Sequence, residues 1–361
     1  MGSKPYSVIV GSGSYIPTKR IKNEDFLNHT FYDSDGKKFD KSNEEVIRKF
    51  SEITGILERR YVTDDLVASD IASIAAEEVF QSSTIDRESL DYIIVAHNFG
   101  DIRADNLHSE FVPTLASRVK MNLGIKNPDT ICYDLPFGCA GWLQGVIQAD
   151  YFIRSGMAKR ALVIGAETLS RICDPHDRDS MIYSDGAGAV VLESRLSETP
   201  IGILSSKTQT NAGDNTYVLK MDRSYNPDYA QDDLFLKMRG RVLYEHALKN
   251  VPPVIRESID RAEIKLTEVD KVLIHQANNK MDEAILKRLF SESGVDHIPD
   301  NIMPMTISWL GNSSVATVPT LYDLIAKGKM EGQQFTNGSL IIFAAVGAGV
   351  NINSVVYKIP A

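Results

Sequence analysis

The sequence predicts an α/β protein in which strands and helices alternate. Two continuous apolar runs, 92–96 and 161–165, are typical of strands in a sheet that is covered on both faces. Helical patterns lie between these runs, and the same alternation returns after residue 200. Because parallel strands need crossover segments of this kind, the alternation predicts a parallel α/β architecture.

The chain opens with a β-rich run at 6–10 that ends at Gly11 and Gly13, so we expect a strand followed by a surface turn through Pro17. A Gly-x-Gly pair after a strand also occurs in dinucleotide sites. Here the third glycine is missing and Pro17 stands where the helix should begin, which argues against a nucleotide site.

Helical periodicity follows at 44–51 and, more strongly, at 67–81. A glycine-containing turn then leads into a third buried strand at 185–192. No helical pattern follows these glycines, so we interpret them as close backbone packing and not as a phosphate cradle.

The second half repeats the pattern of the first, after a polar, turn-rich segment at 211–233. Its predicted elements are strands at 201–208, 271–275 and 340–345, helices at 281–290 and 313–326, and a long helix at 238–262 broken at Pro252 and Pro253. The comparable halves, 1–195 and 196–361, are consistent with a duplicated unit.

Composition excludes several classes of function. A net charge of -9 provides no basic surface for nucleic acid or anionic lipid. No apolar run is long enough to span a membrane and no signal peptide is recognisable, so we expect a cytoplasmic protein. Cys132, Cys139 and Cys173 include no C-x-x-C pair, which argues against disulfides and against a metal site.

Cys139 is the candidate nucleophile. It follows Gly138 and precedes an apolar helical pattern that begins near Trp142. A sulfur at the amino end of a helix lies near free N–H groups and the positive end of the helix dipole, which favour thiolate over thiol. The alternative is a small buried apolar residue, which is the usual role of a lone cysteine.

Two residues of the second half are candidates to assist Cys139. His275 stands at the carboxyl end of a predicted buried strand, where open α/β sheets place their ligands. Asn312 lies between Gly311 and an apolar helical pattern. A satisfied structural histidine and an ordinary helix-capping asparagine are the alternatives.

Together these motifs, at 137–141, 275–278 and 311–314, resemble in order and spacing the β-ketoacyl-[acyl-carrier-protein] synthase III family of the thiolase superfamily. Further matches lie at 11–17, 54–56, 123–126, 173–178 and 184–189. The resemblance implies a five-layered αβαβα sandwich of two similar thiolase-like halves, 1–195 with the cysteine and 196–361 with the histidine and asparagine. It also implies a homodimer.

The resemblance assigns a role to each motif. Cys139 would store an acyl group as a thioester. His275 Nε2 and the Asn312 amide would donate hydrogen bonds to the enolate that forms when a malonyl thioester loses carbon dioxide. The backbone N–H groups of Cys139 and Ala348 would form the oxyanion hole for the acyl carbonyl. No metal or other cofactor is implied, because coenzyme A and acyl-carrier thioesters are substrates.

The binding residues carry over less completely. Arg178 matches an arginine that contacts the coenzyme A nucleotide, but the family's aromatic partner falls at Lys49, with Phe50 beside it as a possible substitute. Lys280 falls where the family has a basic residue that docks the acidic acyl carrier protein; a solvated helix charge is the alternative.

The acyl pocket of the family is closed partly by a residue of the partner subunit, which falls at Val112 here. Valine is smaller than the phenylalanine common in short-chain enzymes, so we expect medium or longer acyl chains. Phe111 would restore an aromatic stop if the register shifted by one residue.

The resemblance implies a condensing acyltransferase of fatty-acid biosynthesis, which would join an acyl group from acyl-CoA or acyl-carrier protein to malonyl-carrier protein. No cysteine follows Cys173, which argues against a thiolase, and Asn312 replaces the second histidine of elongating synthases. A specialised condensing or acyl-transfer enzyme of a lipid, polyketide or pigment pathway stays open, as does a non-catalytic acyl-binding scaffold. Additional segments at 30–43 and 211–233 are candidates to remodel the substrate entrance.

Overall fold

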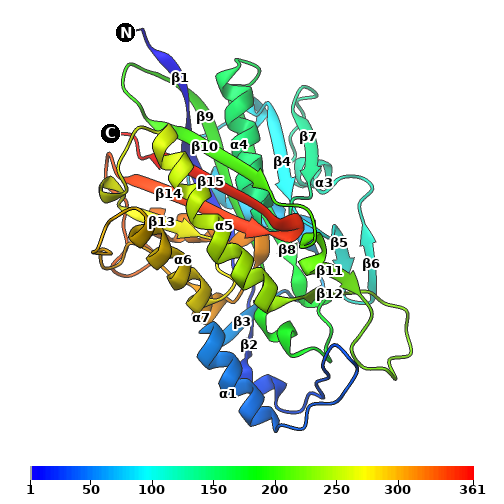
Figure 1. Ribbon diagram of the computed structural model, residues 1–361. Helices are drawn as coiled ribbons and strands as arrows, with labels where there is room; N and C mark the ends of the chain where they lie inside the picture. Colours follow the sequence, from blue (N-terminus) through cyan, green and yellow to red (C-terminus); the bar gives the residue numbers. More distant parts are fainter. Residues whose placement is uncertain (1) are drawn as a thin grey trace.

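The computed structural model describes residues 2–361, and two mixed β-sheets organise the chain (Figure 1). The first sheet has the order β1 (Lys4–Tyr15), β9 (Asp185–Ser197), β8 (Arg160–Thr168), β4 (Tyr92–Ala96) and β7 (Ile131–Leu135). The second has the order β10 (Gly202–Thr210), β15 (Asn351–Lys358), β14 (Leu340–Gly347) and β13 (Lys271–Ile274). The chain thus passes from one sheet to the other between residues 197 and 202, although the division into halves at residue 195 stays a prediction.

The prediction of a parallel α/β architecture holds for only part of each sheet. β4 runs parallel to β7 and β8, and β13 runs parallel to β14. β9 is antiparallel to both β8 and β1, and β15 is antiparallel to both β14 and β10. The reason lies in the connections: β14 reaches β15 through a single 3-10 turn, 348–350, and the segment 169–184 between β8 and β9 contains two 3-10 turns but no crossover helix.

Six helices cover the sheets in three layers. α2 (Ala68–Gln81) and α3 (Leu115–Asn122) pack on the outer face of the first sheet. α4 (Gly141–Arg154) and α8 (Thr317–Ala326) lie between the sheets. α5 (Gly240–Arg261) and α6 (Asn279–Glu292) cover the outer face of the second sheet. This is the αβαβα sandwich that the resemblance implied, and that prediction is confirmed.

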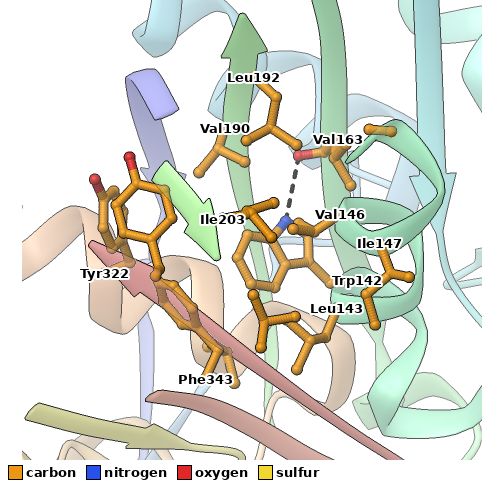
Figure 2. Close-up of a cluster of buried hydrophobic side chains, with 14 of the residues drawn as sticks. Trp142, Leu143, Val146, Ile147, Val163, Val190, Leu192, Ile203, Tyr322 and Phe343 are labelled. Carbon is orange, nitrogen blue, oxygen red and sulfur yellow. Dashed lines mark hydrogen bonds between the residues drawn. The ribbon is translucent and has the colours of Figure 1, made fainter. Parts of the chain in front are cut away.

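Alternation along the strands produces these layers. Ile94 and Val163 belong to the core around α4, whereas their neighbours Ile93 and Leu162 belong to the core under α2. Figure 2 shows the central layer, where Trp142 of α4 is enclosed by apolar side chains and donates its indole N–H to the Val163 carbonyl at 3.3 Å. A strand buried on both faces needs apolar residues throughout, which is why the continuous runs predicted strands correctly.

Smaller elements lie at one end of the sandwich, beside the site described below. They are α1 (Asn43–Thr54), α7 (Ile307–Leu310) and three two-stranded sheets, formed by β2 (Lys19–Lys22) with β3 (Glu58–Tyr61), β5 (Asp101–Arg103) with β6 (Asn106–Glu110), and β11 (Leu219–Asp222) with β12 (Phe235–Met238). Within residues 2–361 no helix is both long and apolar enough to cross a membrane.

Two local predictions were also wrong. β1 continues through Gly11 and Gly13 to Tyr15, because these residues pair with β9 and leave no room for the expected turn. α5 is not broken at Pro252 and Pro253 but runs through both. Its apolar face is buried against the second sheet, which offsets the two backbone hydrogen bonds that proline cannot donate.

Candidate active site

A cavity of about 270 Å³ brings together Cys139, His275 and Asn312 with the backbone at Ala348. A larger cavity of about 790 Å³, lined by Arg178 and Phe50, shares four residues with it. The shared residues are Met238, Leu243, Ala277 and Met281. We refer to the smaller cavity as the inner cavity and to the larger one as the outer cavity; the shared residues show that the two cavities adjoin.

Cys139 lies in a 3-10 turn, 138–140, that leads into α4. Gly138 has a φ of 61°, a left-handed conformation that favours glycine. The turn is held from the second half of the chain, because buried Asn353 of β15 donates its side-chain N–H to the Ala140 carbonyl at 3.2 Å. The nucleophile therefore lies on a backbone fixed by both halves.

The backbone of 347–348 packs directly against this turn. A Cβ added at Gly347 would clash with the Cys139 nitrogen, and one added at Gly138 would clash with the Ala348 nitrogen. Two main chains can approach this closely only where both lack side chains. The backbone N–H groups of Cys139 and Ala348 are thus neighbours, as an oxyanion hole requires.

The protonation of the thiol differs from the sequence-based expectation. Burial raises the pKa of the Cys139 thiol to about 11, and the charge of nearby Glu167 raises it further, against a hydrogen bond from Ser314 that lowers it. The resting group is therefore the thiol and not the thiolate, because desolvation outweighs the position at the start of a helix.

His275 follows the last residue of β13, as predicted, and its backbone N–H donates to the Ala344 carbonyl at 2.8 Å. The next residue anchors the loop: buried Gln276 accepts backbone N–H bonds from Thr306 and Ile307 at 2.8 and 3.0 Å. Burial lowers the pKa of the His275 imidazole to about 4, although a hydrogen bond with the Ser314 backbone opposes this. At neutral pH the ring is uncharged and offers one N–H.

Asn312 follows Gly311, which has a φ of 66°, and its backbone N–H donates to the Ile182 carbonyl at 3.0 Å. Its side-chain Oδ1 accepts the Ser314 N–H at 2.8 Å. With the oxygen engaged in this way, the amide NH₂ is the end left for the cavity. Asn312 does not cap α8, which begins at Thr317.

Sequence reasoning missed Asn98, Glu167 and Ser314. Asn98 and Ser314 line the inner cavity, and buried Glu167 accepts the Asn98 side-chain N–H at 2.8 Å. Asn98 follows β4 closely, and Glu167 lies near the carboxyl end of β8. Polar residues at the carboxyl ends of buried parallel strands are a recognisable signal for a site, and it was not used.

Arg178 and Phe50 both line the outer cavity. The aromatic ring that faces the Arg178 guanidinium is nevertheless Phe39, with 5.4 Å between the guanidinium carbon and the ring centroid. Phe50 is 7% exposed and packs under Arg59. Phe39 belongs to the additional segment 30–43, so the partner of Arg178 comes from a part of the chain that alignment to the family would miss.

Three predicted binding residues lie outside both cavities. Lys280 is exposed in the first turn of α6. Val112 and Phe111 are 90% and 45% exposed, respectively, just beyond the β5–β6 hairpin. A role in an acyl pocket would therefore require that Val112 and Phe111 reach the cavity of a second subunit. In residues 2–361 no group of three or more His, Cys, Asp or Glu side chains could hold a metal ion.

Comparison with known proteins agrees with this geometry. Family models for 3-oxoacyl-[acyl-carrier-protein] synthase III and for its C-terminal part match residues 133–212 and 259–359. The beta-ketoacyl-[acyl-carrier-protein] synthase III of Erythrobacter litoralis (strain HTCC2594) is 32% identical over 346 residues, covering 95% of this chain and 96% of that protein. The chain belongs to the 3-oxoacyl-[acyl-carrier-protein] synthase III family.

Solved structures of synthase III proteins share the whole fold. The crystal structure from Aquifex aeolicus VF5 has a TM-score of 0.77 at 30% identity and covers 98% of this chain and 99% of its own. The one from Thermus thermophilus has a TM-score of 0.79 at 26% identity with the same coverage. The predicted family and fold are confirmed, and this synthase III is a condensing acyltransferase of fatty-acid biosynthesis.

Proposed function

We propose that Cys139 accepts an acyl group from an acyl-CoA or acyl-carrier-protein thioester, and that His275 and Asn312 then support condensation with malonyl-acyl carrier protein. The product would be a 3-oxoacyl-carrier protein. The observation that carries the proposal is one small cavity lined by a thiol, a neutral imidazole and an oriented amide, beside two adjacent backbone N–H groups.

In the first step the Cys139 sulfur attacks the thioester carbonyl and the donor thiol leaves. The backbone N–H groups of Cys139 and Ala348 would hold the oxygen of the tetrahedral intermediate. Because the resting thiol is protonated, its proton must pass to the sulfur of the departing donor, which leaves as a free thiol. A thiol that stays protonated until a thioester binds reacts slowly with other electrophiles, because the thiolate is the reactive form.

In the second step the malonyl thioester loses carbon dioxide, and the enolate carbon attacks the acyl-enzyme. Negative charge then gathers on the thioester oxygen of the enolate. The His275 N–H and the Asn312 NH₂ would donate to that oxygen in a site that excludes water, where each donor is worth about 3 kcal/mol.

The outer cavity supports entry of a donor with a long arm, with Arg178 and Phe39 at its wall and Lys280 outside it for a carrier protein. A homodimer is part of the proposal, because β7 is an edge strand with 49% of Ile131 exposed, and Val112 and Phe111 project from the same half. Cytoplasmic location and independence from cofactors stay predictions.

Intact-protein mass spectrometry tests the two steps separately. Incubation with a panel of acyl-CoA and acyl-carrier donors should add one acyl mass to the wild type, and malonyl-carrier protein should then remove it. Cys139→Ala should show no added mass. His275→Ala and Asn312→Ala should still acylate but lose condensation by about 100-fold or more, since each removes one enolate donor.

Acylation that persists in Cys139→Ala would exclude Cys139 as the nucleophile. An unmodified wild type with every donor would favour a non-catalytic acyl-binding scaffold. Light scattering checks the dimer, and a fully active monomer would contradict that part of the proposal.

A further inference from the structure

Ser314 contacts all three residues that the proposed mechanism uses. Its backbone N–H donates to Asn312 Oδ1 at 2.8 Å, and Ser314 lines the inner cavity together with Cys139 and His275. There the Ser314 hydroxyl lowers the pKa of the Cys139 thiol, and the Ser314 backbone raises that of the His275 imidazole, each against the larger effect of burial. Ser314 is 3% exposed and has a φ of 53°, an unfavourable left-handed conformation for a residue other than glycine. A strained residue in such a position is held there by its surroundings.

Asn98 and Glu167 supply part of that support. Glu167 is 1% exposed; its Oε2 accepts the Asn98 side-chain N–H at 2.8 Å, and its Oε1 accepts the Asn98 backbone N–H at 3.4 Å. Asn98 Nδ2 also donates to Ser314 Oγ at 3.4 Å. Since an amide nitrogen has two hydrogens, one serves Glu167 and the other serves Ser314.

This arrangement determines where the Ser314 hydroxyl hydrogen points. An oxygen that accepts from Asn98 presents its own hydrogen to another acceptor, and the Cys139 sulfur is the acceptor at hand. We propose that Glu167 and Asn98 are positioning residues that aim the Ser314 hydroxyl at the Cys139 sulfur. The inference deepens the proposed function, in that it rests on Cys139 as the nucleophile.

The Ser314 hydroxyl and the Glu167 carboxylate have opposite electrostatic effects on the Cys139 sulfur. The aimed hydroxyl stabilises the thiolate, whereas the negative charge of Glu167 destabilises it. Burial raises the pKa of Glu167 to about 7, while the charges of His97 and Asp185 also act on it in opposite directions. His275 and Tyr183 are the other titratable groups at the thiol, and both stay neutral near pH 7 because burial lowers the pKa of the first and raises that of the second.

These opposite signs provide the test. The rate of Cys139 alkylation by iodoacetamide in the free protein, located by peptide mass spectrometry, reports thiolate without any substrate. Asn98→Ala and Ser314→Ala should slow alkylation at pH 8 by about tenfold, equivalent to about one pKa unit. Glu167→Gln retains an acceptor for Asn98 but removes the charge, so alkylation should become several-fold faster. Ser258→Ala, at a buried serine of α5 outside both cavities, should leave the rate unchanged.

The wild type offers a second measurement that needs no variant. Its logarithmic alkylation rate should rise less steeply between pH 6 and 8 than above pH 8, because ionisation of Glu167 opposes that of the thiol in this interval. A constant slope, equal slowing in all three variants, or an unchanged rate in Asn98→Ala would overturn the inference. Alkylation that follows the expected pattern in a protein that no acyl donor modifies would contradict the proposed function alone.

Discussion

The floor and the entrance of the site are built in different ways. The floor consists of the turns 138–140, 312–314 and 346–348, where main chain packs against main chain and glycines permit the contact. The rim consists of the segments 30–43 and 219–238, which a buried ion cluster, aromatic contacts and a few backbone hydrogen bonds hold in place. The contrast indicates which part of the molecule tolerates change.

Charge holds the rim to the sandwich. Lys237 of β12 is 2% exposed, and its ammonium donates to Asp174 at 2.5 Å and to Asp177 at 3.4 Å. Asp174 also accepts the Tyr225 backbone N–H at 2.7 Å, and the Lys237 ammonium lies 3.4 Å from the centroid of the Tyr225 ring. One buried ion cluster therefore anchors the segment between β11 and β12.

The rim also joins the two additional segments. Tyr32 donates its backbone N–H to the His176 carbonyl at 2.9 Å, and the His176 ring lies 6.2 Å from that of Tyr229. Tyr32, Phe39 and Tyr225 line the outer cavity, and Leu219, Lys220 and Met221 line the inner one. We infer that the floor determines the reaction and that the rim selects the substrate.

We expect the largest loss of activity from a small substitution in the floor. Gly347→Ala adds one methyl group against the Cys139 nitrogen, in a position with extended φ where the residue itself is not strained. Displacement of the Ala348 N–H should lower the rate of acylation by about 100-fold or more. Gly186→Ala is the matched control, since its nearest neighbour is 3.4 Å from the added carbon. Equal rates in both variants, measured by mass spectrometry, would show that the backbone contact is unimportant.

The rim should respond in stability and in KM. Lys237→Met leaves two buried aspartates without their cation, which typically costs about 3 to 5 kcal/mol. We expect a lower free energy of unfolding in urea and a raised KM for the acyl donor, with kcat within about twofold of the wild type. Lys207→Met, which removes a more exposed ion pair, should cost about 1 kcal/mol or less. A large loss of kcat in Lys237→Met would place the cluster in the floor instead.

Chain-length preference should show the smallest effect. If Val112 closes the pocket of the partner subunit, Val112→Phe should shift the ratio of octanoyl to acetyl acylation rates toward acetyl by several-fold for each methylene excluded, at about 0.8 kcal/mol each. Leu196→Phe, also at an exposed apolar residue, serves as the control. A wild type that strongly prefers acetyl to octanoyl and dodecanoyl donors would contradict the expected pocket.

Sequence reasoning succeeded where a local pattern of residues is typical of a single kind of structure. The continuous apolar runs identified β4 and β8, and the motifs identified the loops of Cys139, His275 and Asn312, which the structure brings to one cavity. Strand direction could not be predicted, because periodicity is the same in parallel and antiparallel strands. The absence of a crossover helix in the segment 169–184, between β8 and β9, is seen only in the folded structure.

The protonation of the site and its supporting contacts also depend on tertiary structure. The amino end of α4 predicts a thiolate at Cys139, but the depth of burial that reverses this is a property of the folded chain. Similarly, Phe39 faces Arg178 because a long segment returns to the outer cavity. Local sequence patterns do not show that a distant segment packs beside Arg178. The sequence therefore indicated Phe50, which lies next to the family's aromatic position at Lys49.

The bond from Asn353 to Ala140 joins residues 213 positions apart in the chain. During synthesis the cysteine therefore leaves the ribosome long before the strand that supports it. A nascent chain that ends before β14 and β15 has the thiol but neither the Ala348 N–H nor the Asn353 bond. Because contacts of such long range form late in folding, the nucleophile gains its oxyanion hole only after β14 and β15 have been synthesised and have packed against the turn 138–140. The order of the chain thus places the groups that support acylation after the nucleophile that undergoes it.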